Sequence, residues 1–325
     1  MERNLEKQVD ALLVKLDSLS IETNFARKSY GTIIEAGFRG DNLVLACAVC
    51  RIVMDNKPLT LRSVFYQVVS KGLKPSTDKE HYLAVGRILK RLRRETIIPY
   101  SWIVDSLRST EKPSSWTGLS DYIETIQDSY RKNFWRELPR YVHIITEKDA
   151  IAGVLRPITT KYDVSLSPLR GFASDSFVYS IADTWNQIDK PIHVAYLGDF
   201  DPSGMNIETD CRNRLQDLCE RDFTWTRLGV TANQIKQYGL LPLAPKKRDR
   251  RYKQFIEEHG AKCAEVDAIE ANELRRMTEE FITNYIPSDE WEHLQRVEAL
   301  ERDTFDKTLA PLRESLVIPS SGHAY

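Results

Sequence analysis

Three acidic residues in the second half of the chain follow apolar runs that have the composition of buried strands. Glu147 comes directly after the run at 141–146, and Asp199 and Asp201 come directly after the run at 192–198. In an open parallel sheet, functional groups gather at the carboxyl ends of strands. Converging carboxylates repel one another unless a cation is present, and Mg²⁺ favours a small number of hard oxygen ligands. The sequence therefore predicts that these three side chains bind Mg²⁺.

The alternative interpretation is that these acidic residues are structural. Asp199 and Asp201 would then cap a helix, and Glu147 would be a solvated turn residue. A lone Asp-x-Asp favours this alternative, but the combination in this chain is more specific. It consists of a strand-terminal Glu, a complete helix–strand–helix crossover, and a strand-terminal Gly-Asp-Phe-Asp-Pro-Ser-Gly at 198–204. We therefore prefer the metal-binding interpretation.

The segments around these carboxylates resemble the Toprim domain. Glu-Lys-Asp-Ala at 147–150 and the motif at 198–204 are similar to the versions in A subunits of topoisomerase VI and in the related meiotic double-strand-break transesterases. Arg-Gly-Phe at 170–172 also resembles a turn of that family. The resemblance covers the chain from about residue 40 to about residue 215. The chain is short for such a subunit and resembles the minimal A-type proteins of bacteria, plasmids and phages.

The resemblance implies an α/β fold in which an N-terminal winged-helix (CAP-like) domain precedes a C-terminal Toprim domain with a parallel sheet between helices. It also implies catalytic as well as Mg²⁺-binding roles for Glu147, Asp199 and Asp201. In these roles Glu147 passes a proton to or from the departing sugar oxygen. Double-stranded DNA would be the substrate, and the active species would be a homodimer.

Tyr66 is the candidate nucleophile. The family carries its catalytic tyrosine in a pattern like Arg-Asp-Ile-Phe/Tyr-Tyr, and residues 62–66 match it except that Ser63 replaces the Asp. A tyrosine oxygen that attacks a backbone phosphorus stores the energy of the cut in a phosphotyrosyl bond. Arg62 lies four residues earlier on the same helical face and would stabilise charge on the phosphate. The alternative is that Phe65 and Tyr66 are core aromatics of an apolar helix.

By the same resemblance, Tyr66 would work with the metal site of the second protomer and leave 5′-phosphotyrosyl ends. No glycine-rich ATP-binding motif is present in the sequence. Strand passage would therefore require a separate ATPase subunit.

Two basic segments are candidates for contacts with DNA. Within the helix expected over 80–95, cations at helical spacing form one stripe, which consists of Arg87, Lys90, Arg91 and Arg94. In a winged helix the third helix enters the major groove, and phosphate contacts supply affinity with little sequence choice. The second segment, at 245–253, contains Lys246, Lys247 and Arg248. A solvated charged surface is the alternative for both segments.

Two further acidic residues, Glu265 and Asp267, follow the second basic segment. Similar acidic segments follow the Toprim core in bacterial and phage relatives of this group. Their role is open at this point, and a helix cap or a salt bridge is the interpretation that we prefer.

The elements that position these residues change in character along the chain. The first half favours helices at 3–19, 41–56, 61–72 and 80–95, then short β-structure at 96–107. The second half favours a helix at 120–136, strands at 141–146, 164–169 and 192–198, and helices at 148–161 and 174–187, with mostly helix from about 205. We expect an N-terminal helix (1–30), a winged-helix domain (31–112), a linker and helix (113–140), and a Toprim domain with a helical C-terminal extension (141–325).

Composition sets further bounds. The 325 residues carry a net charge of −1, so global charge does not by itself indicate nucleic-acid binding. No apolar run approaches the roughly 18 residues that span a bilayer, and we expect a cytoplasmic, nucleoid-associated protein without a membrane partner. Cys47 and Cys50 form a Cys-x-x-Cys without further zinc ligands nearby. We expect them to be buried, reduced helix residues.

Three functions remain open on these residues. The first is Mg²⁺-dependent DNA cleavage by transesterification through Tyr66 in a homodimer. The second is a Toprim nuclease of the plasmid or phage defence type that hydrolyses DNA with water, with Tyr66 purely structural. The third is a non-enzymatic winged-helix DNA-binding regulator whose acidic pocket receives a phosphoryl group or a ligand.

Overall fold

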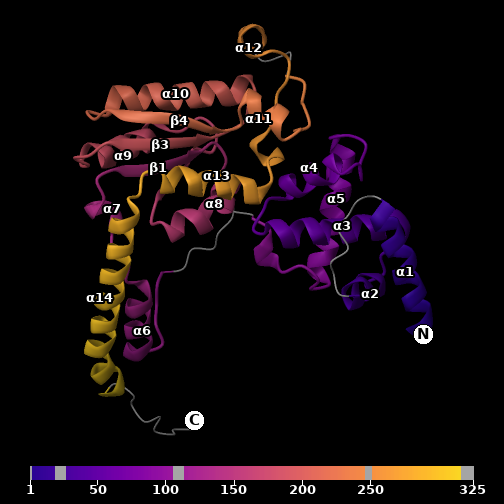
Figure 1. Ribbon diagram of the computed structural model, residues 1–325, viewed down its shortest axis with the longest axis horizontal. Helices are drawn as coiled ribbons and strands as arrows, with labels where there is room; N and C mark the ends of the chain where they lie inside the picture. The colour runs from indigo at the N-terminus through magenta and orange to yellow at the C-terminus, as the bar shows by residue number, and fades with distance from the viewer. Residues whose placement is uncertain (1, 19–26, 105–112, 246–250, 316–325) are drawn as a thin grey trace.

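The computed structural model describes residues 2–18, 27–104, 113–245 and 251–315. The chain begins with a helical part and continues into a parallel sheet that alternates with helices (Figure 1). The helical part consists of α1 (Glu2–Ser18), α2 (Arg27–Glu35), α3 (Gly40–Asn56), α4 (Leu61–Ser70), α5 (Lys79–Arg94) and the 3₁₀ turn η1 (Tyr100–Trp102).

The sheet part begins with two short helices and then alternates strands and helices. Its elements are α6 (Leu119–Ser129), α7 (Phe134–Glu137), β1 (Tyr141–Thr146), α8 (Asp149–Lys161), β2 (Ser165–Pro168), α9 (Asp175–Asn186), β3 (Ile192–Leu197), α10 (Pro202–Leu218), β4 (Phe223–Gly229), α11 (Ala232–Gln237), α12 (Tyr252–His259), the 3₁₀ turn η2 (Val266–Ala268), α13 (Ala271–Thr283) and α14 (Ser288–Ser315). None of the helices formed by the described residues combines the length and apolar composition that crossing a bilayer requires.

Local chemistry marks both ends of α4. Thr60 caps α4 by accepting a hydrogen bond from the Ser63 backbone N–H at 2.9 Å, and Gly72 follows the helix with a φ of 71° that favours glycine. Val9, Leu12 and Leu16 of α1 are buried in the core that α1 shares with the helices that follow. Cys47 and Cys50 are buried, unpaired thiols on α3, which confirms their structural interpretation.

Two expectations for the segments that follow α5 are wrong in the described residues. Instead of short β-structure, residues 97–104 form the turn η1 and a single bridge between Ile103 and Leu59. Ile98 is buried, so the apolar pattern there belongs to the core of the helical part. The helix expected over 120–136 is interrupted, because α6 ends at Ser129 and α7 begins at Phe134.

The sheet contains four parallel strands in the order β2-β1-β3-β4. Successive strand residues point to opposite faces. Ile145, Val194 and Tyr196 pack against α9 and α10, whereas Val142, Ile144 and Leu197 belong to the core that includes α8 and α13. The alternating α/β architecture expected for the second half is therefore confirmed. The expectation of mostly helix beyond about residue 205 missed the edge strand β4.

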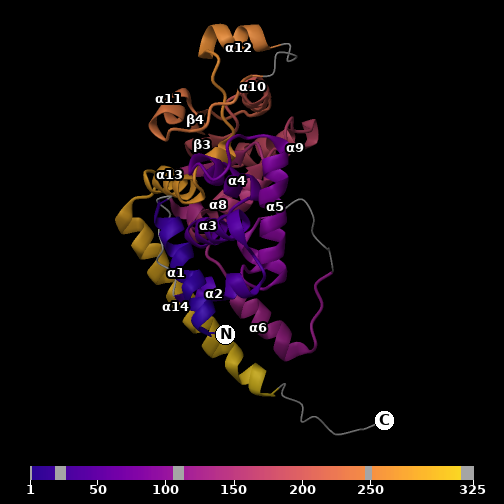
Figure 2. The same cartoon turned by 90° about the vertical axis from the view of Figure 1, so that its right-hand side faces the viewer.

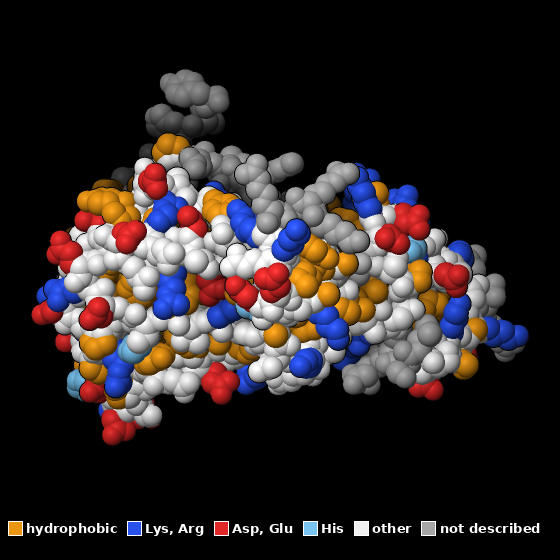
Figure 3. All heavy atoms as spheres, turned by 90° about the horizontal axis from the view of Figure 1, so that it is seen from above, with side chains coloured by type: hydrophobic (Ala, Val, Ile, Leu, Met, Phe, Trp, Pro, Cys, Tyr) orange, Lys and Arg blue, Asp and Glu red, His pale blue; other side chains and the backbone are white. Residues whose placement is uncertain are grey.

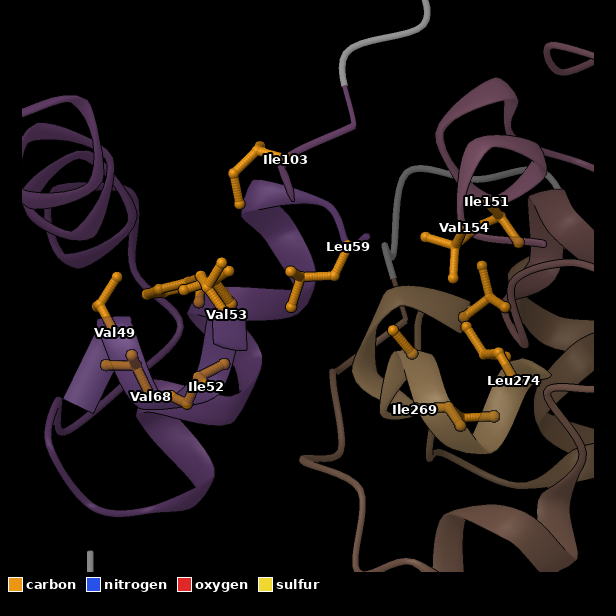
Figure 4. Close-up of a cluster of buried hydrophobic side chains, with 14 of the residues drawn as sticks. Val49, Ile52, Val53, Leu59, Val68, Ile103, Ile151, Val154, Ile269 and Leu274 are labelled. Atoms are coloured by element: carbon orange, nitrogen blue, oxygen red, sulfur yellow. The ribbon is translucent and has the colours of Figure 1, made fainter. Parts of the chain in front are cut away.

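One hydrophobic cluster continues from the helical part into the sheet part (Figure 4). Leu59 is fully buried and lies between the other helical members of the cluster and the segment that carries Ile269 and Leu274. The other labelled members are Val49, Ile52, Val53, Val68 and Ile103 on the helical side, and Ile151 and Val154 on the sheet side. The two parts are thus joined by a shared core.

At the end of the chain, α14 runs beside α6 and extends away from the sheet (Figures 1 and 2). The Tyr130 hydroxyl donates to Glu301 at 2.6 Å, and Arg302 donates to the Tyr130 carbonyl at 2.6 Å, so the contact is polar as well as apolar. On the face seen from above, Lys/Arg and Asp/Glu side chains intermingle across the described residues, in keeping with the near-zero net charge (Figure 3).

Candidate functional site

The predicted acidic residues lie at the point where the strand order of the sheet reverses. The chain leaves β1 to form β2 on one side and then returns to form β3 on the other side of β1. Ligand sites of open α/β sheets lie outside the carboxyl ends of the strands at such a switch point. Glu147 follows β1, and Asp199 and Asp201 follow β3, so both segments reach the same edge of the sheet.

Glu147 faces the turn that carries the two aspartates. Its Oε2 accepts a hydrogen bond from the Asp199 backbone N–H at 2.8 Å. Glycines make room for this contact, because a Cβ on Gly198 would lie 2.9 Å from Glu147 Oε2 and one on Gly204 would lie 2.4 Å from the Asp199 carbonyl. Burial, then the nearby charge of Asp199, raise the pKa of Glu147 to about 7.

Asp201 has the capping role that the structural alternative assigns to it. Its Oδ1 accepts from the Gly204 backbone N–H at 2.7 Å at the start of α10. Pro202 occupies the first turn of that helix, where the missing N–H is harmless. One oxygen of Asp201 is therefore engaged in the fold, and its charge still reaches Glu147, whose pKa it helps to raise.

Asp199 is paired with a cation of the protein itself. Its Oδ1 lies 2.7 Å from Lys148 Nζ and also accepts from the Val266 backbone N–H at 2.9 Å. The same ammonium lies 3.2 Å from Glu265 Oε2 and 3.0 Å from Asp267 Oδ2. Burial lowers the pKa of Lys148, but the three carboxylates outweigh burial and raise this pKa above its ordinary value. The salt-bridge interpretation of Glu265 and Asp267 is confirmed.

The network continues to the first turn of α4. Arg62 forms a salt bridge with Glu265, and the Thr60 hydroxyl donates to Asp267 Oδ1 at 2.7 Å. Arg62 is thus held by an acidic residue more than two hundred positions away. Spacing along the chain gave no signal for this partnership.

Arg227 on β4 holds the aspartate turn from the opposite side. Its Nη2 donates to the carbonyls of Gly198 and Asp199 at 3.1 and 2.7 Å. The guanidinium also pairs with Glu208, which accepts a further hydrogen bond from Trp225 Nε1 at 2.9 Å. Sequence reasoning missed Arg227, because the strand that carries it was not expected.

Tyr66 lies in another cavity than Glu147 but close enough to Glu265 to feel its charge. It is only 6% exposed and lines a cavity of about 300 Å³ together with Gln67 and Tyr238. Burial, followed by the charge of Glu265, raises the pKa of Tyr66 above its ordinary value. Glu147 lines a different cavity, so within one chain the structure does not bring Tyr66 and Glu147 to a common space.

The cavity beside Glu147 is a groove of about 1050 Å³ between α5 and the carboxyl end of β1. Its cationic lining comes from Lys90, Arg93 and Arg94 on α5, from Arg62 on α4, and from Arg170 in the turn after β2. That turn is tied to the site, because the Gly171 N–H donates to the Glu147 carbonyl at 3.1 Å. Cationic side chains and carboxylates therefore line one cavity.

The predicted cationic residues of α5 are divided between two cavities. Lys90 and Arg94 line the groove, whereas Arg87 and Arg91 line a second cavity of about 390 Å³. Arg91 is also engaged in the fold, because it donates to the Ala36 carbonyl and lies over the Phe38 ring, 4.6 Å from its centre. Lys246, Lys247 and Arg248 of the second basic segment lie outside the described residues.

The carboxylates at the switch point are oxygen donors of the type that Mg²⁺ accepts. Three carboxylates reach one edge of the sheet, and the glycines at 198 and 204 keep the space beside Glu147 Oε2 free of side-chain carbon. Among the residues that the structure describes, no group of three or more His, Cys, Asp or Glu side chains stands in an arrangement ready to hold a metal ion. With Lys148 Nζ on Asp199, an incoming ion would have to take the place of the ammonium.

Comparisons with protein-family models and with curated proteins find no match to this chain. The geometry of the site itself is therefore the basis for assigning a function.

Proposed function

We propose that this chain is a Mg²⁺-dependent DNA-cleaving enzyme of the topoisomerase VI A type, with the sheet part acting as a Toprim domain. The observation that carries the proposal is the groove of about 1050 Å³, which has the cations of α5 on one wall and Glu147 at the sheet switch point on the other. The cations suit the phosphate backbone of double-stranded DNA. The carboxylates suit the metal that phosphoryl transfer needs.

The proposed reaction is a transesterification. Tyr66 Oη attacks a backbone phosphorus, an Oη–P bond forms, the P–O3′ bond breaks, and the 5′-phosphate stays on the tyrosine. By the resemblance, the departing 3′ oxygen would take its proton from Glu147, acting as a general acid. The proton of Tyr66 passes to solvent. Bound Mg²⁺ would polarise the phosphoryl oxygens and stabilise the charge that develops on them.

The resemblance implies that cleavage by this route uses two copies of the chain. Within one copy, Tyr66 and Glu147 line separate cavities. We therefore propose a homodimer in which Tyr66 of each protomer serves the groove of the other. Resealing with strand passage would require a separate ATPase subunit.

A second candidate is hydrolysis of DNA by water at the same groove. The burial of Tyr66 and its raised pKa favour this candidate, because both disfavour a phenolate nucleophile in the arrangement described. In this case Tyr66 is a core residue, and a monomer suffices.

Trapping of protein–DNA adducts separates the candidates. Supercoiled plasmid is incubated with the protein and Mg²⁺, the reaction is stopped with denaturing detergent, and DNA bound to protein is measured. We expect adducts that are lost in Tyr66→Phe and kept in Tyr179→Phe, which alters an exposed tyrosine on α9. Free ends with full cutting in Tyr66→Phe would establish hydrolysis. No cutting with any divalent ion, with sequence-specific binding that survives Asp199→Asn, would establish a DNA-binding regulator instead.

A further inference from the structure

Lys148 joins three segments of the chain at one point. Its ammonium lies within 3.2 Å of carboxylate oxygens from Asp199, Glu265 and Asp267. These residues come from the turn after β3 and from the segment around η2, and Lys148 itself follows β1. The side chain of Asp267 is 3% exposed and that of Asp199 is 11% exposed, so water screens these pairs only weakly.

The partners of Lys148 are also the partners of α4. Glu265 Oε2 is shared, because both Lys148 Nζ and Arg62 Nη1 contact that one oxygen. Asp267 is shared in a similar way, with Oδ2 facing Lys148 and Oδ1 accepting from Thr60, the N-cap of α4. A change in the position of the Lys148 ammonium therefore bears directly on the first turn of the helix that carries Tyr66.

We propose that Lys148 is a positioning residue that acts as an internal counter-ion, and that a divalent ion displaces it from Asp199 and thereby loosens the first turn of α4. This inference rests on the proposed Mg²⁺ site. An ammonium and a divalent cation repel each other strongly at contact distance, so they do not share Asp199 Oδ1. Lys148 and Arg62 already share Glu265 Oε2. Once Lys148 loses Asp199 to the ion, its ammonium depends more on Glu265 and competes more strongly with Arg62 for that oxygen.

The coupling gives the metal a second effect in addition to its chemistry. Without the ion, Lys148 and Arg62 share Glu265, and Tyr66 stays buried beside this network. With the ion, the hold of Glu265 on Arg62 weakens. The inference therefore ties the order of the helix that carries Tyr66 to the loading of the carboxylate site.

Metal affinity without DNA is the first test. Calorimetric titration with Mg²⁺ compares the wild type with Lys148→Met and with Lys161→Met, which removes a lysine from an exposed pair with Glu279. We expect Lys148→Met to bind Mg²⁺ about tenfold more tightly or better, because the competing charge is gone, and we expect Lys161→Met to match the wild type. Unchanged or weaker binding in a folded Lys148→Met would overturn the inference while leaving the metal site standing. No Mg²⁺ binding in the wild type would overturn both.

Hydrogen exchange over residues 61–70 is the second test, and it does not depend on the folding of Lys148→Met. In the wild type, we expect Mg²⁺ to speed exchange in the first turn of α4. Glu265→Gln weakens the link to Arg62 but keeps Asp199, so it should bind Mg²⁺ within about threefold of the wild type and show no Mg²⁺-dependent change in exchange. Wild-type exchange that is the same with and without bound Mg²⁺ would rule out the coupling.

Discussion

At the scale of single residues, the site depends on side chains that hold backbone rather than substrate. Arg227 donates to two carbonyls of the aspartate turn and neutralises Glu208, which is 8% exposed. Removing one partner of a buried ion pair leaves the other charge without compensation. Arg227 therefore serves both the stability of the fold and the position of Asp199.

We predict that Arg227→Met lowers the free energy of unfolding by about 3 kcal/mol and weakens Mg²⁺ binding. Chemical denaturation and calorimetry measure the two effects. Arg221→Met is the matched control, because its pair with Asp189 is exposed and should contribute little. Equal behaviour of the two variants would show that Arg227 does not position the turn.

Gly204 gives a steric prediction at the same scale. A Cβ there would lie 2.4 Å from the backbone carbonyl of Asp199, which cannot move without disturbing the turn. Gly204→Ala should cost about 1–3 kcal/mol of stability through overpacking and reduce Mg²⁺ binding. Gly118→Ala is the control, because a Cβ at Gly118 meets nothing within 4 Å. A Gly204→Ala variant as stable as Gly118→Ala would contradict the described turn.

At the scale of elements, the burial of each strand determined whether its sequence pattern predicted it. Strands β1 and β3 are buried over nearly their whole length, so continuous apolar runs predicted them to within a residue. Strand β4 lies at the edge of the sheet, where its residues alternate between exposed and half-buried, and its Thr and Arg side chains gave no apolar run. The expected β-structure after α5 failed for the opposite reason, since Ile98 is apolar because it fills the core.

The candidate site was open to sequence reasoning only in part. Glu147, Asp199 and Asp201 each adjoin a recognisable strand, so their approach to one sheet edge followed from topology. The partners of Lys148 lie more than fifty residues away along the chain, and only the tertiary fold brings them together. The separation of Tyr66 from Glu147 likewise depends on how α4 packs against the segment around η2, which no local pattern encodes.

Strand β1 also gives a prediction about pH. His143 is buried, with Nδ1 3.0 Å from Trp185 Nε1 and Nε2 2.9 Å from Ser167 Oγ. Burial lowers the pKa of His143 from 6.5 to about 4. Below about pH 6.5, the unfolded chain therefore binds a proton that the folded chain does not, and stability falls as the pH drops towards about 4.

We predict that His143→Gln loses about 2 kcal/mol less stability than the wild type between pH 7 and pH 5. Glutamine keeps an acceptor for Trp185 and a donor for Ser167, so the substitution mainly removes the titrating group. Urea denaturation at the two pH values measures the difference. His293→Gln, at an exposed position on α14, should follow the wild type. The account of His143 fails if all three proteins show the same pH dependence.

At the scale of the whole molecule, the shared core joins the groove's two walls. The cluster in Figure 4 runs from the helical part to the sheet part, so α5 and the carboxyl end of β1 are held opposite each other by apolar packing. Two parts joined in this way should unfold together. The groove would then be a fixed feature of the folded chain.

Leu59→Ala tests this continuity. The residue is fully buried in the shared cluster, so we predict a loss of about 3 kcal/mol with unfolding still in one transition. Far-UV circular dichroism follows the whole chain, whereas tryptophan fluorescence follows mainly the sheet part, because five of the six tryptophans lie beyond residue 112. The two curves should coincide and shift together, and Leu83→Ala, at a half-exposed position on α5, should shift neither. Separate transitions would show two independent parts.

The position of a bound divalent ion tests the central claim most directly. Anomalous scattering from crystals grown with Mn²⁺, which accepts the same oxygen ligands as Mg²⁺, locates the ion without reference to any reaction. The account predicts a peak within coordination distance of Glu147 and of at least one of Asp199 and Asp201, with Lys148 Nζ moved away from Asp199. A peak elsewhere on the molecule, with the Lys148–Asp199 pair still in place, would contradict it.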